Sequence, residues 1–270
     1  MSWLGDYHVH TTFCDGKAEA DELAAQAAAL GLKTLGFSGH ANTPFDASWC
    51  MSRAGTQAYL ETLRRLKQQY DGRLAILVGT ELDYFSPPPE GIYDYTIGSC
   101  HYVLVDGAYL PVDESAGLLR QSIEQHFSGD FLQFARKYYE QMADMQRKTN
   151  CTFIGHLDLL SKFNEGGQYF SEDKAYLSLA FDAADVLCAQ GAVFEINTGA
   201  MRRGYRSVPY PSFPILRRIC ENGARIILSS DCHDAQGLCF AFDDAAALAR
   251  RAGFRSRCVL TDGSLHEIPL

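Results

Sequence analysis

Seven short runs of apolar, β-branched or aromatic residues recur along this chain, and segments of helical character separate them. The runs are DYHVH at 6–10, KTLGFSGH at 33–40, LAILVGTELDY at 74–84, DYTIGSCHYV at 94–103, CTFIGHLDLL at 151–160, AVFEINT at 192–198 and ARIILSSDCH at 224–233. Strands that alternate with helices form largely parallel sheets with the helices outside. The pattern predicts an α/β fold, either closed as a barrel or wound open. Because 270 residues is within the range of one α/β barrel, we expect a single domain over 1–270.

Four segments between these runs are predicted to be helices. They are EADELAAQAAALG at 19–31, GTQAYLETLRRLKQQYDG at 55–72, SEDKAYLSLAFDAADVLCAQG at 171–191 and PSFPILRRICENG at 211–223. Each is expected to place its final glycine at the position after the C-cap, where a left-handed conformation stops a helix. Ser171, with Glu172 and Asp173 behind it, is expected to mark the start of the third helix.

Two segments interrupt this alternation. The SPPPEG turn at 86–91 is incompatible with a helix or a central strand, because proline lacks a backbone N–H group. From about 105 to 150 the chain makes a longer excursion, in which 116–127 and 130–149 have amphipathic helical patterns. We predict that this excursion acts as a lid or substrate cover.

Charge and cysteine content limit the partners and the compartment. Lys and Arg number 24 against 33 Asp and Glu, a net charge of −9, so the surface field repels nucleic acid. No apolar run approaches the roughly 20 residues of a membrane span, and no signal-peptide pattern precedes Asp6. The 9 cysteines include no CxxC pair, and their odd number fits a reducing compartment. We expect a cytoplasmic protein without nucleic-acid or membrane partners; the sequence leaves homo-oligomer formation open.

Side chains that bind metals gather at the ends of the predicted strands. In DYHVHTTFCDG, His8 and His10 point to the same face because strand side chains alternate, and Asp15 follows. Six of the seven runs carry such groups at or near their carboxyl ends, where parallel α/β folds build their sites. The full set is His8, His10, Asp15, His40, Glu81, His101, His156, Asp231 and His233. Only AVFEINT has no assigned ligand, although it contains Glu195.

The residue types in this set indicate the chemistry. Imidazole and carboxylate ligands together suit Zn²⁺, Fe²⁺ or Mn²⁺, and so many ligands exceed the needs of one ion. The sequence predicts two or three divalent ions, which would activate water and neutralise oxyanion charge in phosphoester or amide hydrolysis. Independent structural histidines are the alternative, but they would scatter over helices and loops as well. Cys100 and Cys232 face away from the neighbouring ligands by the same alternation, so we expect them to be packing residues.

The order of these residues resembles the polymerase and histidinol phosphatase (PHP) superfamily of metal-dependent phosphoesterases. The shared pattern is HxH with a following Asp, an isolated His, a Glu, two further His and a final DxH, which together span 6–233. The resemblance implies a distorted (β/α)₇ TIM-like barrel with a trinuclear site at the carboxyl ends of the strands. The three implied ligand sets are His8, His10, Glu81 and Asp231; then Glu81, His101 and His156; and finally Asp15, His40 and His233. Glu81 would bridge two of the ions.

Within the superfamily, DYHVHTTFCDG, GHLDLLSKFN and EINTGAMRR look most similar to the histidinol-phosphate phosphatase branch. This resemblance implies hydrolysis of L-histidinol phosphate, a reaction of histidine biosynthesis. It also implies phosphate-binding cations at Lys162 and at Arg202 or Arg203, with Arg206 less favoured.

Further roles within this interpretation concern the leaving group. Asp15 or His233 would supply its proton, and Glu81 would act through the bridged ions. Asp113 and Glu114 in the excursion are candidates for contacts with the ammonium and imidazole groups of the substrate.

Other interpretations keep part of the pattern. The same site would serve a PHP phosphoesterase that acts on another small phosphate ester or on a nucleotide. An amidohydrolase-type barrel shares HxH and a late Asp, but usually needs fewer ligands and no phosphate-binding cations. A non-catalytic, metal-stabilised accessory module is the interpretation from a different class, and the filled ligand positions disfavour it.

Overall fold

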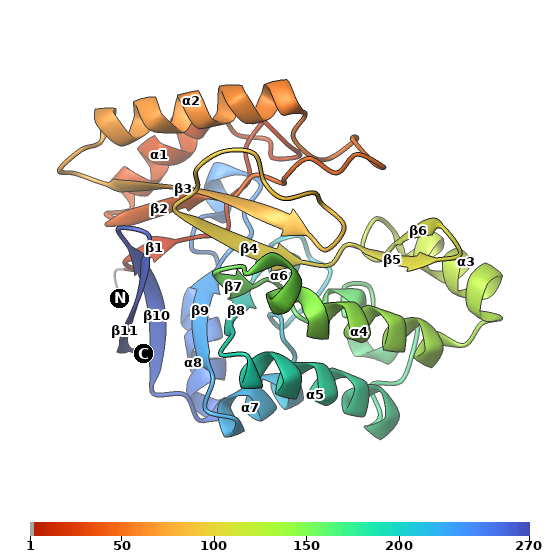
Figure 1. The fold of residues 1–270 in the computed structure, drawn as a ribbon. Coiled ribbons are helices and arrows are strands. Elements are labelled where there is room, and N and C mark those ends of the chain that lie inside the picture. Colours follow the sequence, from red (N-terminus) through yellow and green to blue (C-terminus); the bar gives the residue numbers. More distant parts are fainter. Residues whose placement is uncertain (1–2) are drawn as a thin grey trace.

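Seven parallel strands follow the seven apolar runs in the computed structural model, which describes residues 3–270 (Figure 1). They are β1 (Gly5–Asp6), β2 (Thr34–Phe37), β3 (Ala75–Asp83), β4 (Tyr95–Ser99), β7 (Phe153–Ile154), β8 (Val193–Asn197) and β9 (Arg225–Ser229). Neighbours in this order pair in parallel. The predicted α/β fold is confirmed; residues 1–2 of the predicted domain lie outside the described residues.

The sheet curls into a distorted barrel because the chain after β1 meets the chain after β9. Val9 and Cys232 form a parallel bridge there. The N–H of His10 donates to the Cys232 carbonyl oxygen at 2.9 Å, and the N–H of Cys232 donates to the His8 carbonyl oxygen at 3.1 Å. The predicted ligands of the first and last runs therefore lie side by side, and the expected TIM-like barrel is confirmed.

The chain after His233 forms elements that were not predicted from the sequence. Helix α8 (Phe242–Ala252) leads into an antiparallel hairpin of β10 (Ser256–Thr261) and β11 (Ser264–Pro269). β10 also pairs in parallel with β9, which distorts the barrel next to its closure and makes the sheet mixed. The turn 262–263 is Asp-Gly with positive φ at both residues, a hairpin signal that was available in the sequence.

The predicted helices are present and cover the outside of the barrel: α1 (Ala20–Ala29), α2 (Arg53–Gln69), α5 (Lys174–Ala189) and α7 (Phe213–Glu221). α2 packs against α1 and β3, while α5 packs against α7 on the other side of the barrel (Figure 1). A glycine with positive φ directly follows the C-cap in three of these helices, at Gly31, Gly191 and Gly223. Among the helices of residues 3–270, none has both the length and the apolar character needed to cross a bilayer.

Two helix ends differ from the prediction. The N-cap of α5 is Asp173, whose carboxylate accepts hydrogen bonds from two backbone N–H groups of the first turn. Ser171 was wrong as the start, because Asp173 already satisfies these donors two residues later. Gly72 lies one residue farther from its helix than predicted, since the C-cap of α2 is Tyr70.

The excursion at about 105–150 has two parts. The first is a hairpin of β5 (Tyr102–Val105) and β6 (Ala108–Pro111), followed by α3 (Ala116–Phe127), at one end of the barrel (Figure 1). The second, α4 (Phe131–Thr149), packs against α5 and β4 and therefore serves as an outer helix of the barrel. Of these parts, the hairpin and the residues just after it border the cavity described below.

An apolar layer fills the barrel beneath the carboxyl ends of the strands. The ring of Tyr95 crosses this interior, and its hydroxyl lies 2.7 Å from the carbonyl oxygen of Tyr7 and 3.0 Å from that of Phe37. Gly79 leaves room for the ring, because a Cβ there would lie 2.3 Å from it. Strand β3 thus presents a glycine where the ring crosses, and Glu81 two residues later on the same face.

The short segments α6 (Gly199–Arg202), η1 (Leu159–Ser161), η2 (Glu165–Gly167) and η3 (Ala235–Gly237) follow β7, β8 and β9. Of the residues in or directly after these segments, Lys162 follows η1 and Arg202 lies in α6, and both line the cavity described below.

Candidate metal centre

The carboxylate of Glu81 is surrounded by imidazole rings from four other strand ends. Glu81 lies on β3 and is 1% exposed. Its Oε2 atom is 3.0 Å from Nε2 of His8 and 3.0 Å from Nδ1 of His40. Its Oε1 atom is 3.1 Å from Nε2 of His156 and 3.5 Å from Nε2 of His101. This geometry suits a carboxylate that links two neighbouring cation sites.

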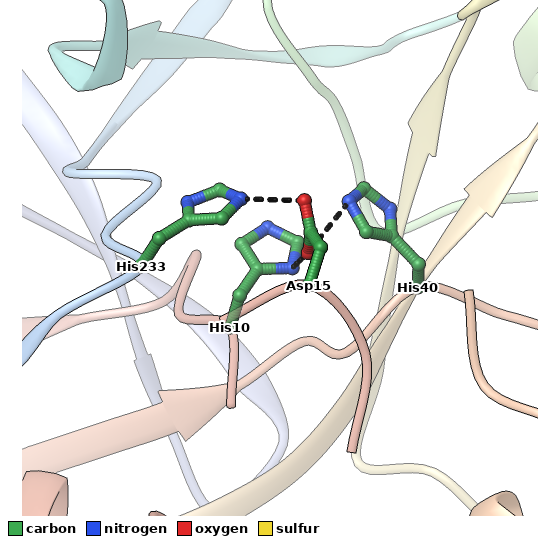
Figure 2. Close-up of side chains that lie close together, drawn as sticks. All are labelled: His10, Asp15, His40 and His233. Atoms are coloured by element: carbon green, nitrogen blue, oxygen red, sulfur yellow. Dashed lines mark hydrogen bonds and ion pairs between the residues drawn. The ribbon is translucent and has the colours of Figure 1, made fainter. Parts of the chain in front are cut away.

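A second group of rings faces Asp15, in the turn after the first run (Figure 2). Oδ2 of Asp15 is 3.0 Å from Nε2 of His233. Oδ1 is 3.6 Å from Nε2 of His40 and 3.7 Å from Nδ1 of His10. Figure 2 shows the three rings turned toward this one carboxylate from three different segments of the chain.

Asp231 connects the two groups. Its Oδ1 atom is 3.3 Å from Nε2 of His10 and 3.7 Å from Nε2 of His8. Asp231 has a φ of 50°, which is uncommon for a residue other than glycine, at the point where the chain leaves β9. Gly199 provides the space for this carboxylate, because a Cβ there would lie 2.7 Å from Asp231 Oδ2.

The structure thus brings all of the predicted ligands to one mouth of the barrel. Four groups have ligand atoms within 4.8 Å of one another: His10, Asp15, His40 and His233; His8, His156 and Asp231; His8, His10 and Glu81; and His40, Glu81 and His101. These groups overlap the predicted sets but share members differently, since His10 also reaches Asp15 and His40 also reaches Glu81. The assignment of each ligand to an ion stays a prediction. Cys100 and Cys232 are buried in apolar clusters, as expected.

Buried nitrogen atoms without hydrogen-bond partners test whether this mouth fits metal ions. Nε2 of His10, Nδ1 of His40 and Nδ1 of His156 are buried and make no hydrogen bond. Nδ1 of His40 lacks hydrogen-bond geometry even though it is 3.0 Å from Glu81. Buried polar atoms are normally paired, and converging nitrogen and oxygen lone pairs suit a shared cation. The residues present therefore fit divalent metal binding.

The electrostatics of the mouth favour the ligand forms of Glu81 and His10, whereas neighbouring carboxylates outweigh burial and raise the pKa values of His8 and His101. Burial alone would raise the pKa of Glu81, but the rings of His8 and His40 outweigh burial and hold this pKa well below its usual range. Burial lowers the pKa of His10 to about 3, and the neighbouring His40 and His233 lower it further. At neutral pH Glu81 is therefore ionised and His10 is neutral, which are the forms that coordinate metals.

A cavity of about 390 Å³ opens over these groups and carries both signs of charge. Lys162, at the end of η1, donates from Nζ to Oδ2 of Asp113 at 3.0 Å and to its carbonyl oxygen at 2.8 Å. Burial alone would raise the pKa of Asp113, but the Lys162 ammonium outweighs it and lowers this pKa to about 2. Glu114 lines the same cavity. A predicted phosphate-binding cation and a predicted substrate-binding acid are thus paired with each other.

The predicted arginines occupy different positions. Arg202 lies at the cavity rim and pairs with Asp234 at 3.2 Å. Arg203 also lines the cavity, but its Nη2 donates to Oδ2 of Asp231 at 3.0 Å, so it contacts a predicted metal ligand directly. Arg206, the less favoured candidate, is buried and donates to the carbonyl oxygen of Ser161 at 3.0 Å.

Two buried carboxylates beside the ligands were not assigned roles from the sequence. Glu195 on β8 lies 2.5 Å from Nδ1 of His8. Asp83 accepts a hydrogen bond from the backbone N–H of His101 at 2.8 Å and lies 3.3 Å from its Nδ1. Both side chains point to the inward face of their strands, which strand alternation could have predicted. Alternation does not reveal which histidine each carboxylate contacts.

A hydrogen-bonded chain at the cavity rim was also missed. Trp49 donates from Nε1 to the hydroxyl of Tyr102 at 2.7 Å, and that hydroxyl donates to Asp46 at 2.7 Å. The ring of Trp49 lies edge-on to His40, with centroids 4.5 Å apart. An aromatic surface and an acidic group therefore flank the predicted ligands.

Comparison with known proteins agrees with this geometry. A family model described as the PHP domain matches residues 6–199. A protein of Deinococcus radiodurans named "Probable histidinol-phosphatase" is 30% identical over 268 residues, which cover 95% of this chain and 96% of the relative. The histidinol-phosphatase of Bacillus subtilis is 24% identical, over 88% of this chain and 96% of the relative.

Solved structures show the same fold. A histidinol phosphate phosphatase of Lactococcus lactis, complexed with Zn, L-histidinol and phosphate, has a TM-score of 0.69 at 19% identity and covers 97% of this chain and 98% of its own. A candidate histidinol phosphatase of Listeria monocytogenes has a TM-score of 0.76 at 20% identity, over 89% of this chain and 99% of its own. The family model and the curated relatives show that the sequence, and not the fold alone, is similar to these proteins. This chain therefore belongs to the PHP domain family, in the branch of the histidinol-phosphatases.

Proposed function

We propose that this protein is a metal-dependent phosphatase that hydrolyses L-histidinol phosphate to L-histidinol and phosphate. The observation that carries this proposal is the presence, in one cavity, of seven of the nine predicted metal ligands together with the cations Lys162, Arg202 and Arg203. The names of the curated relatives support the substrate. The Lactococcus lactis protein of the same fold binds Zn, L-histidinol and phosphate, which supports it further.

The proposed site holds two or three divalent ions, of zinc, iron or manganese. His8, His10, Glu81 and Asp231 would hold the first, Glu81 with His101 and His156 the second, and Asp15 with His40 and His233 the third. Bound ions would activate water and neutralise the charge that develops on the phosphate oxygens. Catalysis of phosphoryl transfer otherwise depends on positioning and on charge, and both come from the cavity lining.

Phosphate binding would use the cations that face the cavity. The ammonium of Lys162 and the guanidinium of Arg202 would each exchange a carboxylate partner for phosphate oxygens. Arg203 would keep Asp231 oriented as a ligand while it faces the same phosphate, since a guanidinium presents several donors in one plane.

The leaving group would meet the acidic part of the cavity. When phosphate engages Lys162, the carboxylate of Asp113 becomes free to accept a hydrogen bond from the substrate ammonium group. Trp49 and Asp46 offer an aromatic and an acidic contact to an imidazole ring. Asp15 and His233, whose Oδ2 and Nε2 atoms are 3.0 Å apart, would position a water molecule that gives a proton to the departing alkoxide oxygen.

We also place the reaction in the cytoplasm, as predicted from the cysteine content. All 9 cysteines are free thiols, which supports a reducing compartment.

Phosphate release from L-histidinol phosphate tests the function, measured beside a panel of nucleotide and sugar phosphates on protein of known metal content. We expect a kcat/KM about 100-fold or more above that of any other ester, a difference of about 2.7 kcal/mol in transition-state binding. Turnover of many esters, or a preference for nucleotides, would support a phosphatase but reject L-histidinol phosphate as its specific substrate. Absence of turnover of every ester at full metal loading would favour the accessory module.

A further inference from the structure

Glu195 is a buried carboxylate to which the proposed reaction assigns no role. It lies on β8, the strand without a predicted ligand, and is 1% exposed. Its Oε1 atom lies 2.5 Å from Nδ1 of His8 and accepts a hydrogen bond from the hydroxyl of Ser229 at 2.5 Å. Its Oε2 atom accepts from the backbone N–H of His156 at 2.7 Å and from Nδ2 of Asn197 at 3.0 Å. One carboxylate thus contacts two predicted metal ligands that follow two different strands.

The contact with His8 determines which ring nitrogen is free. Because an ionised carboxylate only accepts hydrogen bonds, Nδ1 of His8 must carry the proton in this pair. The other nitrogen, Nε2, faces Oε2 of Glu81 at 3.0 Å and Oδ1 of Asp231 at 3.7 Å, where a cation would sit. In metal proteins such a partner fixes the tautomer and the orientation of the ring and makes the coordinating nitrogen more basic.

The surroundings of Glu195 admit a carboxylate better than an amide. Oδ1 of Asn197 accepts from the backbone N–H of Gly199 at 2.8 Å, so the amide group of Asn197 must point toward Glu195 as a donor. The backbone N–H of His156 is a donor as well. A glutamine at 195 would place its own NH₂ group against the donors of His156 and Asn197 or, if the amide is turned over, against those of His8 and Ser229.

We propose that Glu195 is a positioning residue of the metal centre, which holds His8 in the Nδ1-protonated form and fixes the backbone of His156. It thereby sets the affinity for the ions that these two histidines approach. This inference rests on the proposed metal site and is independent of the substrate.

The test compares Glu195→Gln with a matched change at another buried carboxylate. Asp158 is also 1% exposed and accepts from the backbone N–H of Ser212 at 2.9 Å, without a side-chain contact to a predicted ligand. Zinc affinity is measured on wild type, Glu195→Gln and Asp158→Asn by competition with a chromogenic chelator, and metal content by mass spectrometry. We expect zinc affinity to fall about 10- to 100-fold in Glu195→Gln and to stay at the wild-type value in Asp158→Asn.

A spectroscopic measurement keeps the inference testable if Glu195→Gln does not fold. In zinc-loaded wild-type protein, ¹⁵N spectra of the histidine rings should show His8 with a proton on Nδ1 and metal on Nε2, assigned through a His8→Asn variant. Glu195→Asp, which retains the charge but withdraws the carboxylate, should weaken this Nδ1 hydrogen bond and shift its proton resonance.

Three results would overturn the inference. They are unchanged zinc affinity in folded Glu195→Gln, equal losses in Glu195→Gln and Asp158→Asn, and coordination of His8 through Nδ1. Wild-type protein that binds no zinc, iron or manganese would overturn both this inference and the proposed metal site. Wild-type protein that binds zinc but does not hydrolyse L-histidinol phosphate would reject the substrate alone, and the affinity difference would still support the role of Glu195.

Discussion

At the scale of single residues, the cavity pairs charges that a substrate would separate. Lys162 and Asp113 neutralise each other as a direct ion pair in the cavity lining, where we expect a charged phosphate ester to bind. A buried or half-buried ion pair is costly to break by removing one partner, because the other charge then stays without compensation. A substrate that supplies both a phosphate and an ammonium group would avoid this cost.

Lys162→Met tests the phosphate contact. We expect kcat/KM for the phosphate ester to fall about 10- to 100-fold, as for the loss of one hydrogen bond to a charged group, with metal content unchanged. Lys137→Met, which removes an exposed lysine that pairs with Glu140 on α4, is the control. Steady-state kinetics identical to wild type in Lys162→Met would show that another cation binds the phosphate.

At the scale of elements, the site depends on how strands and loops are held against one another. The β5–β6 hairpin and the residues after it connect to η1 through the contact between Asp113 and Lys162. Packing inside the barrel depends on Gly79, which leaves room for the Tyr95 ring to cross the interior. Each of these contacts has a measurable share in stability.

The contact between Asp113 and Lys162 predicts a pH-dependent contribution to stability. The ammonium of Lys162 outweighs burial and lowers the pKa of Asp113 to about 2 in the folded protein, against about 3.9 in an unfolded chain. The folded pKa is the lower one, so this stabilisation is complete above about pH 5 and is lost as the pH falls toward 2. Its full size is at most about 2.6 kcal/mol.

Urea unfolding of wild type and Asp113→Asn between pH 6 and pH 3 measures this contribution. The difference in unfolding free energy should shrink as the pH falls. Asp106→Asn, at an exposed turn residue of the same hairpin, is the control. A difference that grows with falling pH would contradict the assigned direction.

Gly79→Ala tests the apolar layer of the barrel. The new Cβ would lie 2.3 Å from the Tyr95 ring, so overpacking should cost about 1–3 kcal/mol of unfolding free energy. Gly117→Ala, at an exposed position of α3 with its nearest neighbour 3.9 Å away, should instead be neutral or stabilising by up to about 1 kcal/mol. Thermal unfolding distinguishes them, and equal melting temperatures would contradict this account of the layer.

At the scale of the whole molecule, the fold and the mouth of the barrel were predictable for one reason. Strand alternation, together with the carboxyl-end rule for parallel sheets, placed the ligands on one side of one sheet. The hydrogen-bond partners of these ligands were harder to predict from the sequence, because they depend on closure of the barrel. Glu195, for example, contacts His8 although 187 positions of sequence separate them. The same holds for Lys162, which was predicted to bind phosphate and is found paired with Asp113.

The metal ions should stabilise the whole molecule. The ligands come from β1, β2, β3, β4, β7 and β9 or from the segments that follow them, so bound ions would join most of the barrel. At a zinc concentration about 100 times the dissociation constant, the gain is about 2.7 kcal/mol, or roughly 5–10 °C in melting temperature for a chain of this size.

Calorimetry of chelator-treated protein, with and without added zinc, measures this gain. Glu81→Ala should lose most of the shift together with bound metal and turnover, because Glu81 is the shared carboxylate. An equal zinc-dependent shift in wild type and Glu81→Ala would contradict the bridging role.

The closure of the barrel between Val9 and Cys232 also has a consequence for biosynthesis. Asp15 leaves the ribosome early, whereas His233, its partner at 3.0 Å, is separated from it by 218 positions. At about 5–20 residues per second, translation needs roughly 10–40 s to make the intervening chain. For more than half of that time a nascent chain holds six or seven of the nine predicted metal ligands without Asp231 and His233, so complete metal loading would report that nearly the whole chain has been made and folded.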